Sequence, residues 1–196
     1  MLTLYHAPRS RSTRMLWLLE ELGADYHVEY VDIVRGYPSP SGAPDPRNPH
    51  PLKQVPAMLV EGVLIVESVI QFLYLTDRYE GLAPTVGDPR RAEYLAWLGL
   101  YNGVLEPVAA PRFRGEMTPV QADAYAELDR RWRAALEKGP YMMGDHFTAV
   151  DILFGSLLQF YRTVMPEYPV YDEYLARIQS RPALARAAEK DAEPDG

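Results

Sequence analysis

The segment from Leu52 to Ser68 restricts the folds open to this chain more than any other. It contains two short apolar runs, Ala57–Val60 and Val63–Val66, which only the pair Glu61-Gly62 separates. Two apolar runs joined by two turn-forming residues are typical of a β-hairpin. The dipeptide Val55-Pro56 precedes the first run, where a proline fits because it begins the strand. The segment therefore predicts two antiparallel strands that follow an extended stretch of backbone.

A helix is expected directly after this hairpin. Ser68 is followed three residues later by Gln71, a spacing that indicates a capping box at a helix start. The unpaired N–H groups and the dipole of a helix N-terminus favour a carboxylate or a phosphate. We therefore expect a small anion to bind at this helix, with the backbone of Val55 as the other half of the site.

The residues before the hairpin predict a strand, a helix and a second strand. Leu2–Tyr5 alternates as a strand does, the apolar residues from Met15 to Leu22 recur at helical spacing, and Tyr26–Ile33 again reads as a strand. Six prolines between residues 35 and 53 favour an irregular loop. With the hairpin and a helix over 68–79, the order is βαβ–ββα. This order is that of a thioredoxin-like domain.

The remainder of the chain has helical periodicity throughout. We expect a linker over 80–87, a helix over 88–115 that Asp88-Pro89 starts and that bends near Pro107 and Pro111, and a second helix from Thr118-Pro119 to residue 138. Thr148 and Asp151 form another helix cap, and further helices follow over 171–181 and after residue 182. The fold class is therefore α+β, with a thioredoxin-like domain over 1–79 and an all-helical domain over 88–196.

Composition excludes several classes of function. The net charge of −7 argues against nucleic acid or an anionic membrane as the main partner. The chain of 196 residues has no cysteine, which excludes disulfides, cysteine-ligated zinc and a thiol nucleophile. Its four histidines show no spacing typical of metal ligands, so no metal is expected. Neither a signal peptide nor a membrane span is recognisable, so the expected location is cytoplasmic.

The motif Gln54-Val55-Pro56-Ala57, followed by Glu67-Ser68, resembles the glutathione-binding half of cytosolic glutathione transferases. The resemblance covers nearly the whole chain and is to bacterial-type members with a serine-containing first loop. It implies a cis Val55–Pro56 bond, a Val55 backbone that pairs with the cysteinyl part of glutathione, and a Glu67-Ser68 pair that holds the γ-glutamyl end. Gln54 belongs to the same motif, and Lys53 or His50 lies close enough in sequence to contact the glycine carboxylate.

Three hydroxyl groups in the first loop are candidates for stabilising the glutathione thiolate. A hydroxyl group beside a helix N-terminus can lower a thiol pKa from about 8.5 toward neutrality. In serine-type transferases the catalytic serine precedes a helix arginine by four or five positions, and Ser10 stands four before Arg14. Ser12 lies nearer the helix and is equally suited to be its N-cap. Tyr5 is the third candidate, because some classes use a tyrosine at the end of the first strand.

The resemblance implies an enzyme of detoxification that conjugates the glutathione thiolate to small apolar electrophiles. Glutathione would be its co-substrate, and a two-fold homodimer its assembly. An aromatic and basic cluster of Tyr101, Arg112, Phe113 and Arg114 would wall the electrophile pocket, although such residues on a long helix also serve the core, a dimer contact and solvent. The alternatives are a glutathione-dependent peroxidase or isomerase, and a non-catalytic interaction module of the same fold.

Overall fold

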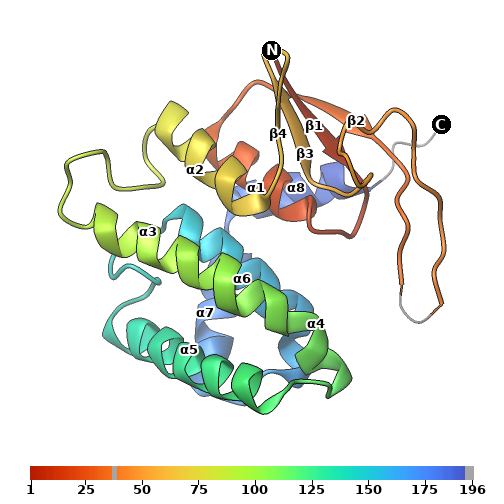
Figure 1. Cartoon of the computed structure of the whole chain (residues 1–196). Helices are drawn as coiled ribbons and strands as arrows, with labels where there is room; N and C mark the ends of the chain where they lie inside the picture. The colour runs from red at the N-terminus through yellow and green to blue at the C-terminus, as the bar shows by residue number, and fades with distance from the viewer. Residues whose placement is uncertain (37–38, 193–196) are drawn as a thin grey trace. The chain divides into compact units, whose positions relative to one another are not determined.

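The computed structural model describes residues 1–36 and 39–192, which form two units (Figure 1). The first unit contains residues 1–79 together with the last helix, α8 (Pro182–Asp191). The second unit contains residues 80–181. The sequence predicts the segment after residue 182 to belong to the helical domain, whereas this helix packs on α1 of the first unit.

The first unit is built on a four-stranded mixed sheet. Its strands are β1 (Leu2–His6), β2 (His27–Tyr30), β3 (Ala57–Val60) and β4 (Val63–Ile65), in the order β2-β1-β3-β4. β1 pairs in parallel with β2 and antiparallel with β3. The predicted βαβ–ββα order is confirmed.

The predicted hairpin is also confirmed, and the φ angles of its two turn residues explain why a glycine is present. Glu61 and Gly62 join β3 to β4 with φ angles of 52° and 85°. Positive φ at both central residues matches the right-handed twist of paired strands and favours glycine in one of these positions. The Val55–Pro56 bond ahead of the hairpin is cis.

Three helices belong to the first unit: α1 (Thr13–Leu22), α2 (Ser68–Arg78) and α8. α1 ends at Gly23, whose φ of 60° is the left-handed conformation typical of a helix C-cap. The blue helix α8 lies beside α1 (Figure 1). Arg186 and Lys190 of α8 bind the Glu20 carboxylate of α1, at 2.8 and 2.6 Å. This ion pair fixes the end of the described chain to the helix that follows the first loop.

The second unit is helical. Its elements are α3 (Arg91–Leu100), a π-helical turn (Tyr101–Leu105), α4 (Glu106–Arg114), α5 (Pro119–Lys138), α6 (Ala149–Tyr161), a 3₁₀ turn (Arg162–Val164) and α7 (Pro169–Gln179). Trp132 lies in its core, with ring centroids 4.9 Å from Phe154 and 5.1 Å from Tyr171. Large aromatic side chains therefore fill the space between α5, α6 and α7.

Two of the three predicted helix starts in this unit are confirmed. Thr118 forms a capping box with Gln121, and Thr148 forms one with Asp151. The predicted start at Asp88 is too early, because α3 begins at Arg91. The Asp88 carboxylate accepts a hydrogen bond from the backbone N–H of Arg90 in the turn before the helix. The single helix expected over 88–115 is interrupted by the π-helical turn.

Among the described residues, no helix combines the length and the apolar character that crossing a membrane requires.

Candidate functional site

The loop between β1 and α1 holds both candidate serines, and Ser12 is the buried one. Ser12 occupies the N-cap position of α1, but its side chain makes no capping hydrogen bond. Its fully buried Oγ lies 2.7 Å from His6 Nδ1 and accepts a hydrogen bond from the N–H of Ala7 at 3.2 Å. The hydroxyl group of Ser12 therefore holds the loop to the end of β1 instead of capping the helix.

Ser10 is the outer hydroxyl group of the same loop. Its side chain is half-buried, and its Oγ lies 2.7 Å from Ser12 Oγ. The backbone N–H of Ser12 donates to Ser10 Oγ at 3.1 Å, and the N–H of Ser10 donates to Thr13 Oγ1 at 3.3 Å. Of the two serines, Ser10 is the one that a ligand at the surface can reach.

Tyr5 and Val55 meet in one apolar cluster. Val55 is buried together with Ala7 and Val31, and the half-buried Tyr5 and Ile33 pack against them. In the sheet, Tyr5 lies opposite Ala57 of β3, only one residue beyond the cis proline. The structure therefore brings the end of β1, and with it the first loop, next to Val55.

The backbone of Val55 is open to a partner. β3 begins two residues later, and within residues 1–36 and 39–192 neither the N–H nor the C=O of Val55 takes part in a backbone hydrogen bond. The preceding Gln54 is exposed, and its carbonyl oxygen accepts a hydrogen bond from Asn48 Nδ2 at 3.0 Å. The fully buried Asn48 also accepts from the N–H of His50 at 3.0 Å, and so it holds the loop in front of the open strand end.

The side chain of Lys53 is directed into its own loop. Lys53 Nζ donates to the carbonyl oxygen of Asn48 at 2.6 Å, and the residue has a φ of 53°. His50 is nearly buried, and its Nδ1 accepts a hydrogen bond from the N–H of Leu52 at 3.0 Å. Lys53 and His50 therefore both have partners inside the loop that leads to Val55.

Glu67 and Ser68 lie at the start of α2, as predicted. Glu67 is the exposed N-cap residue with a φ of 66°, and the half-buried Ser68 is the first helical residue. The predicted capping box is wrong, because the helix has no side-chain cap and Gln71 is used elsewhere. Gln71 is fully buried, and its Nε2 donates to the carbonyl oxygens of Ile65 at 2.8 Å and Pro56 at 3.2 Å.

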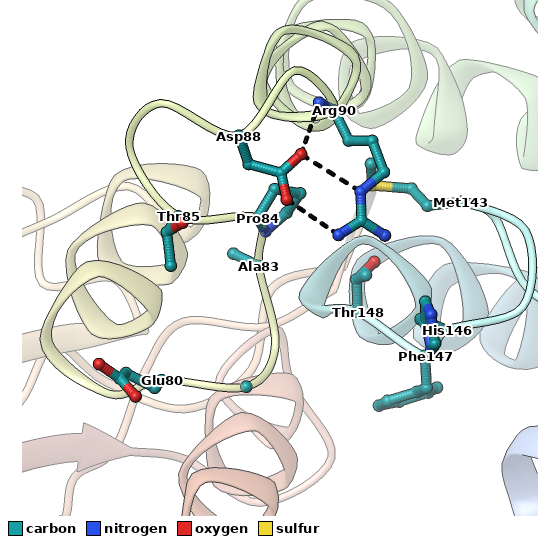
Figure 2. Close-up of a pocket in the computed structure, with 11 residues that line it drawn as sticks. Glu80, Ala83, Pro84, Thr85, Asp88, Arg90, Met143, His146, Phe147 and Thr148 are labelled. Atoms are coloured by element: carbon teal, nitrogen blue, oxygen red, sulfur yellow. Dashed lines mark hydrogen bonds and ion pairs between the residues drawn. The ribbon is translucent and has the colours of Figure 1, made fainter.

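A cavity of about 480 Å³ lies within the second unit, between the segment over 80–90 and the loop before α6. Figure 2 shows the Asp88 carboxylate accepting hydrogen bonds from the backbone and the guanidinium of Arg90, at 2.8 to 3.2 Å. Met143, His146 and Phe147 line the opposite side. None of the site residues predicted from the sequence lines this cavity.

The predicted aromatic and basic cluster does not form one surface. Tyr101 is buried, with its ring centroid 5.4 Å from that of Phe154. Arg112 donates to the carbonyl oxygen of Val164 at 2.9 Å, whereas Phe113 is exposed. Arg114 forms an ion pair with Glu116, at 2.5 Å. Within the described second unit, these residues serve the core, a helix contact and the surface in turn.

Comparison with known proteins gives the family. Residues 1–77 match the N-terminal domain of glutathione S-transferases, and residues 107–186 match a C-terminal domain of the same proteins. The chain belongs to the glutathione S-transferase family. Glutathione S-transferase 3 of Schizosaccharomyces pombe is 31% identical over 109 residues, which are 55% of this chain and 43% of the relative. The match thus spans less than half the length of that relative.

Solved glutathione S-transferases share the fold of this family member. One from Actinobacillus pleuropneumoniae has a TM-score of 0.81 at 24% identity, covering 97% of this chain and 93% of the other. A sphingomonad glutathione S-transferase in complex with glutathione has a TM-score of 0.78 at 24% identity, covering 96% and 98%. The family uses glutathione, and within the described residues of this member no cluster of three or more His, Asp or Glu residues is arranged to hold a metal ion.

Two residues that organise the first loop of this transferase-family chain were missed from the sequence. His6 is fully buried, and its Nε2 lies 3.4 Å from Asp191 Oδ1 at the end of α8. Burial lowers the pKa of His6 to about 4, although the neighbouring Asp191 acts in the opposite direction. Alternation along β1 was an available signal for His6, because Leu2, Leu4 and His6 share a face. No sequence signal marks Asp191, which is 185 residues from His6.

Asp191 also holds the backbone of the loop. The N–H of Arg9 donates to both of its carboxylate oxygens, at 3.2 and 3.1 Å, and the hydroxyl group of Thr13 donates to Oδ1. Arg9 has a φ of 54°, which side chains other than glycine seldom adopt. The carboxylate thereby stabilises the conformation that presents Ser10.

Proposed function

We propose that this protein is a glutathione transferase that conjugates the glutathione thiolate to small apolar electrophiles. The observation that carries the proposal is that the backbone N–H and C=O groups of Val55 have no backbone partner within the described residues. Val55 is part of the motif that resembles this family, and it lies beside the first loop. An extended peptide-like ligand can use both an N–H and a C=O group of such a strand end. Glutathione offers these groups in its cysteinyl residue.

The start of α2 fits the other end of glutathione. We assign the γ-glutamyl part to Glu67 and Ser68, since the carboxylate of Glu67 attracts an ammonium group and the N-terminus of α2 attracts a carboxylate. Gln54 is exposed next to Val55 and is available to the same ligand. Lys53 lies close enough in the chain to serve the glycine carboxylate if its ammonium group leaves the loop carbonyl groups.

Ser10 is the group that we assign to the sulfur atom. A hydroxyl donor and the N-terminus of α1 both favour a thiolate over a thiol. Each unit by which the thiol pKa falls corresponds to about 1.4 kcal/mol of preferential thiolate stabilisation. Ser12 is the supporting group because its Oγ is buried among protein partners, and Tyr5 contributes to the apolar wall.

A homodimer in the cytoplasm remains part of the proposal, as does an electrophile site supplied by the second unit. These assignments rest on family membership and on the exposed aromatic side chains of that unit, such as Phe113 and Phe160. Sedimentation at micromolar concentration tests the dimer.

Calorimetric titration with glutathione tests the proposal, and conjugation of an activated aryl halide tests the chemistry. We expect micromolar to millimolar affinity and turnover that requires glutathione. Ser68→Ala should weaken binding by roughly 1–3 kcal/mol, because a hydrogen bond to a charged group is lost. Thr76→Ala is the matched control, because Thr76 lies in the same helix and its hydroxyl group donates to the backbone carbonyl oxygens of Phe72 and Leu73. Binding without turnover of any electrophile would support a non-catalytic module instead.

A further inference from the structure

A line of polar contacts runs from the last helix of the chain to Ser10. Asp191 Oδ1 lies 3.4 Å from His6 Nε2, and His6 Nδ1 lies 2.7 Å from Ser12 Oγ. Ser12 Oγ in turn lies 2.7 Å from Ser10 Oγ. His6 and Ser12 are both fully buried, so water does not compete for these contacts. The contact between Asp191 and His6 Nε2 is electrostatic, since Nε2 makes no hydrogen bond within residues 1–36 and 39–192. The directions of the other two contacts follow from their donors and acceptors.

The carboxylate determines which ring nitrogen of His6 carries the proton. A neutral imidazole has one N–H group, and an ionised carboxylate can only accept. The proton is therefore favoured on Nε2, because the negative charge of the Asp191 carboxylate 3.4 Å away attracts an N–H group and repels a lone pair. The other groups that face the ring do not compete: Arg35 disfavours the imidazolium, and Tyr30 packs edge-on with its centroid 5.5 Å away. The phenol of Tyr30 is used elsewhere, since it donates to the carbonyl oxygen of Lys190.

The orientation of His6 then fixes both serine hydroxyl groups. The Ser12 hydroxyl group has two acceptors within reach, the carbonyl oxygen of Ala7 at 3.3 Å and Nδ1 of His6 at 2.7 Å. Because Nδ1 is left as an acceptor and is the closer of the two, Ser12 donates its proton to His6. Ser12 Oγ accepts from the N–H of Ala7, and its remaining lone pair receives the proton of Ser10. Ser10 Oγ accepts from the N–H of Ser12, and one lone pair stays directed outward.

We propose that Asp191 is a positioning residue that turns the Ser10 hydroxyl group inward through His6 and Ser12. This inference rests on the proposed function, in which Ser10 meets the sulfur of glutathione. In the resting arrangement the S–H group of glutathione donates to Ser10. When the thiol loses its proton to solvent, the Ser10 O–H must turn from Ser12 to the sulfur. The hydrogen bond from Ser10 to Ser12 therefore disfavours formation of the thiolate. With Asp191 in place, the thiol pKa of bound glutathione is higher than it would be if the Ser10 hydroxyl group were free to face the sulfur.

The proton position on His6 is measured by ¹⁵N NMR on the whole chain without ligand. The chain has four histidines, so the signals are assignable with a His6→Gln variant. Wild type should show His6 protonated at Nε2 and bare at Nδ1, and Asp191→Ala should shift the proton toward Nδ1. Thr13→Val removes another contact of the same carboxylate and should leave the His6 signals unchanged. A proton on Nδ1 in wild type would overturn the inference, whether or not glutathione binds.

The effect on sulfur is measured by ultraviolet titration of bound glutathione. Asp191→Ala should lower the apparent thiol pKa by about one unit, because the O–H of Ser10 is free to face the sulfur. If Asp191 served only to hold the loop, the same variant would displace Ser10 and raise the thiol pKa. The fall should disappear in a Ser10→Ala background; an equal fall there would mean a through-space charge effect and would refute the hydroxyl chain. Failure of native protein to bind glutathione would refute the proposed function and leave the NMR result standing.

Discussion

The two units each contain a polar network that includes an aspartate and fully buried side chains, and the networks differ in whether they reach the surface. In the second unit the fully buried Asp151 accepts hydrogen bonds from the N–H groups of Met142 and Thr148, both at 2.8 Å, and from the hydroxyl group of Tyr174 at 3.0 Å. Burial raises the pKa of Asp151 to about 6, although these hydrogen bonds favour its carboxylate. The Asp151 side chain has no exposed surface, so its network does not reach the solvent.

The network in the first unit begins in the same way and ends differently. Asp191 has protein partners in Arg9, Thr13 and His6, but the last hydroxyl group, that of Ser10, is half-buried. We call the network around Asp151 the closed network, and the network of Asp191, His6, Ser12 and Ser10 the open network. A closed network stabilises one conformation, whereas an open network keeps a polar atom available for a ligand. The comparison separates a group that maintains the fold from one that is available for chemistry, although both networks contain fully buried side chains.

The largest expected effect follows from breaking the closed network. Asp151→Ala would leave two backbone N–H groups and the Thr148 hydroxyl group without their buried acceptor, at roughly 1–3 kcal/mol each. The Tyr174 hydroxyl group keeps the backbone carbonyl oxygen of Asp151, at 3.2 Å. We expect the free energy of unfolding to fall by at least about 3 kcal/mol, measured by urea denaturation. Tyr174→Phe removes only one donor and should cost about 1 kcal/mol. Similar losses for the two variants would contradict the closed network.

Breaking the buried part of the open network comes next. Ser12→Ala would leave the N–H of Ala7 and His6 Nδ1 without their partner, so we expect a loss of about 2 kcal/mol in the free energy of unfolding. Replacing a serine that only caps a helix would lower the free energy of unfolding by about 1 kcal/mol. The measurement is again urea denaturation, with glutathione titration on the folded variant. A stable Ser12→Ala protein whose bound thiol no longer ionises near neutral pH would move the thiolate role from Ser10 to Ser12.

The closed network was predictable from the sequence, but most of the open one was not. Thr148 and Asp151 are three residues apart, so their capping box is a local pattern. The hairpin and the start of α2 at Ser68 were local patterns too, and both were found. Asp191 and His6 meet only because α8 packs on α1, and no local pattern encodes a contact between the two ends of a chain. Gln71 was predicted to form a capping box with Ser68. Its side chain instead faces the sheet and donates to the carbonyl oxygens of Ile65 and Pro56.

Ser10→Ala tests the open end itself. The variant removes the hydroxyl donor from the sulfur and leaves the N-terminus of α1, so the apparent pKa of bound glutathione should rise by about one unit. To stabilise the thiolate, the Ser10 hydroxyl group must give up its hydrogen bond to Ser12. The net stabilisation of the thiolate is therefore near the lower end of the roughly 1.5–3 kcal/mol that a hydrogen bond to a charged group contributes. Ultraviolet titration measures it, and Tyr5→Phe is the control that should leave the titration nearly unchanged. A shift in the control alone would transfer the role to Tyr5.

The smallest expected effect concerns the ion pairs of Glu20 with Arg186 and Lys190, which hold α8, the helix that carries Asp191, to α1. Burial raises the pKa of Glu20, but hydrogen bonds from Lys190, Arg186 and Tyr26 outweigh it and lower the pKa to about 2. Because the folded protein binds this proton less tightly than the unfolded chain, Glu20 stabilises the fold above a pH of about 4.5. That contribution disappears as the pH falls toward 2.

Glu20→Gln should therefore lower the free energy of unfolding at neutral pH by about 1 kcal/mol, the upper end for partly exposed pairs. The matched control is Glu127→Gln, since Glu127 also binds two arginines, at 2.7 Å each, but within one exposed helix. Such i,i+3 and i,i+4 pairs are screened by solvent and contribute little to stability. Urea denaturation at pH 7 and pH 3 gives the comparison, and the difference between the variants should narrow at the lower pH. Since α8 carries Asp191, only Glu20→Gln should also disturb the NMR signals of His6; equal effects of the two variants on His6 would show that the ion pair does not hold α8 against the loop.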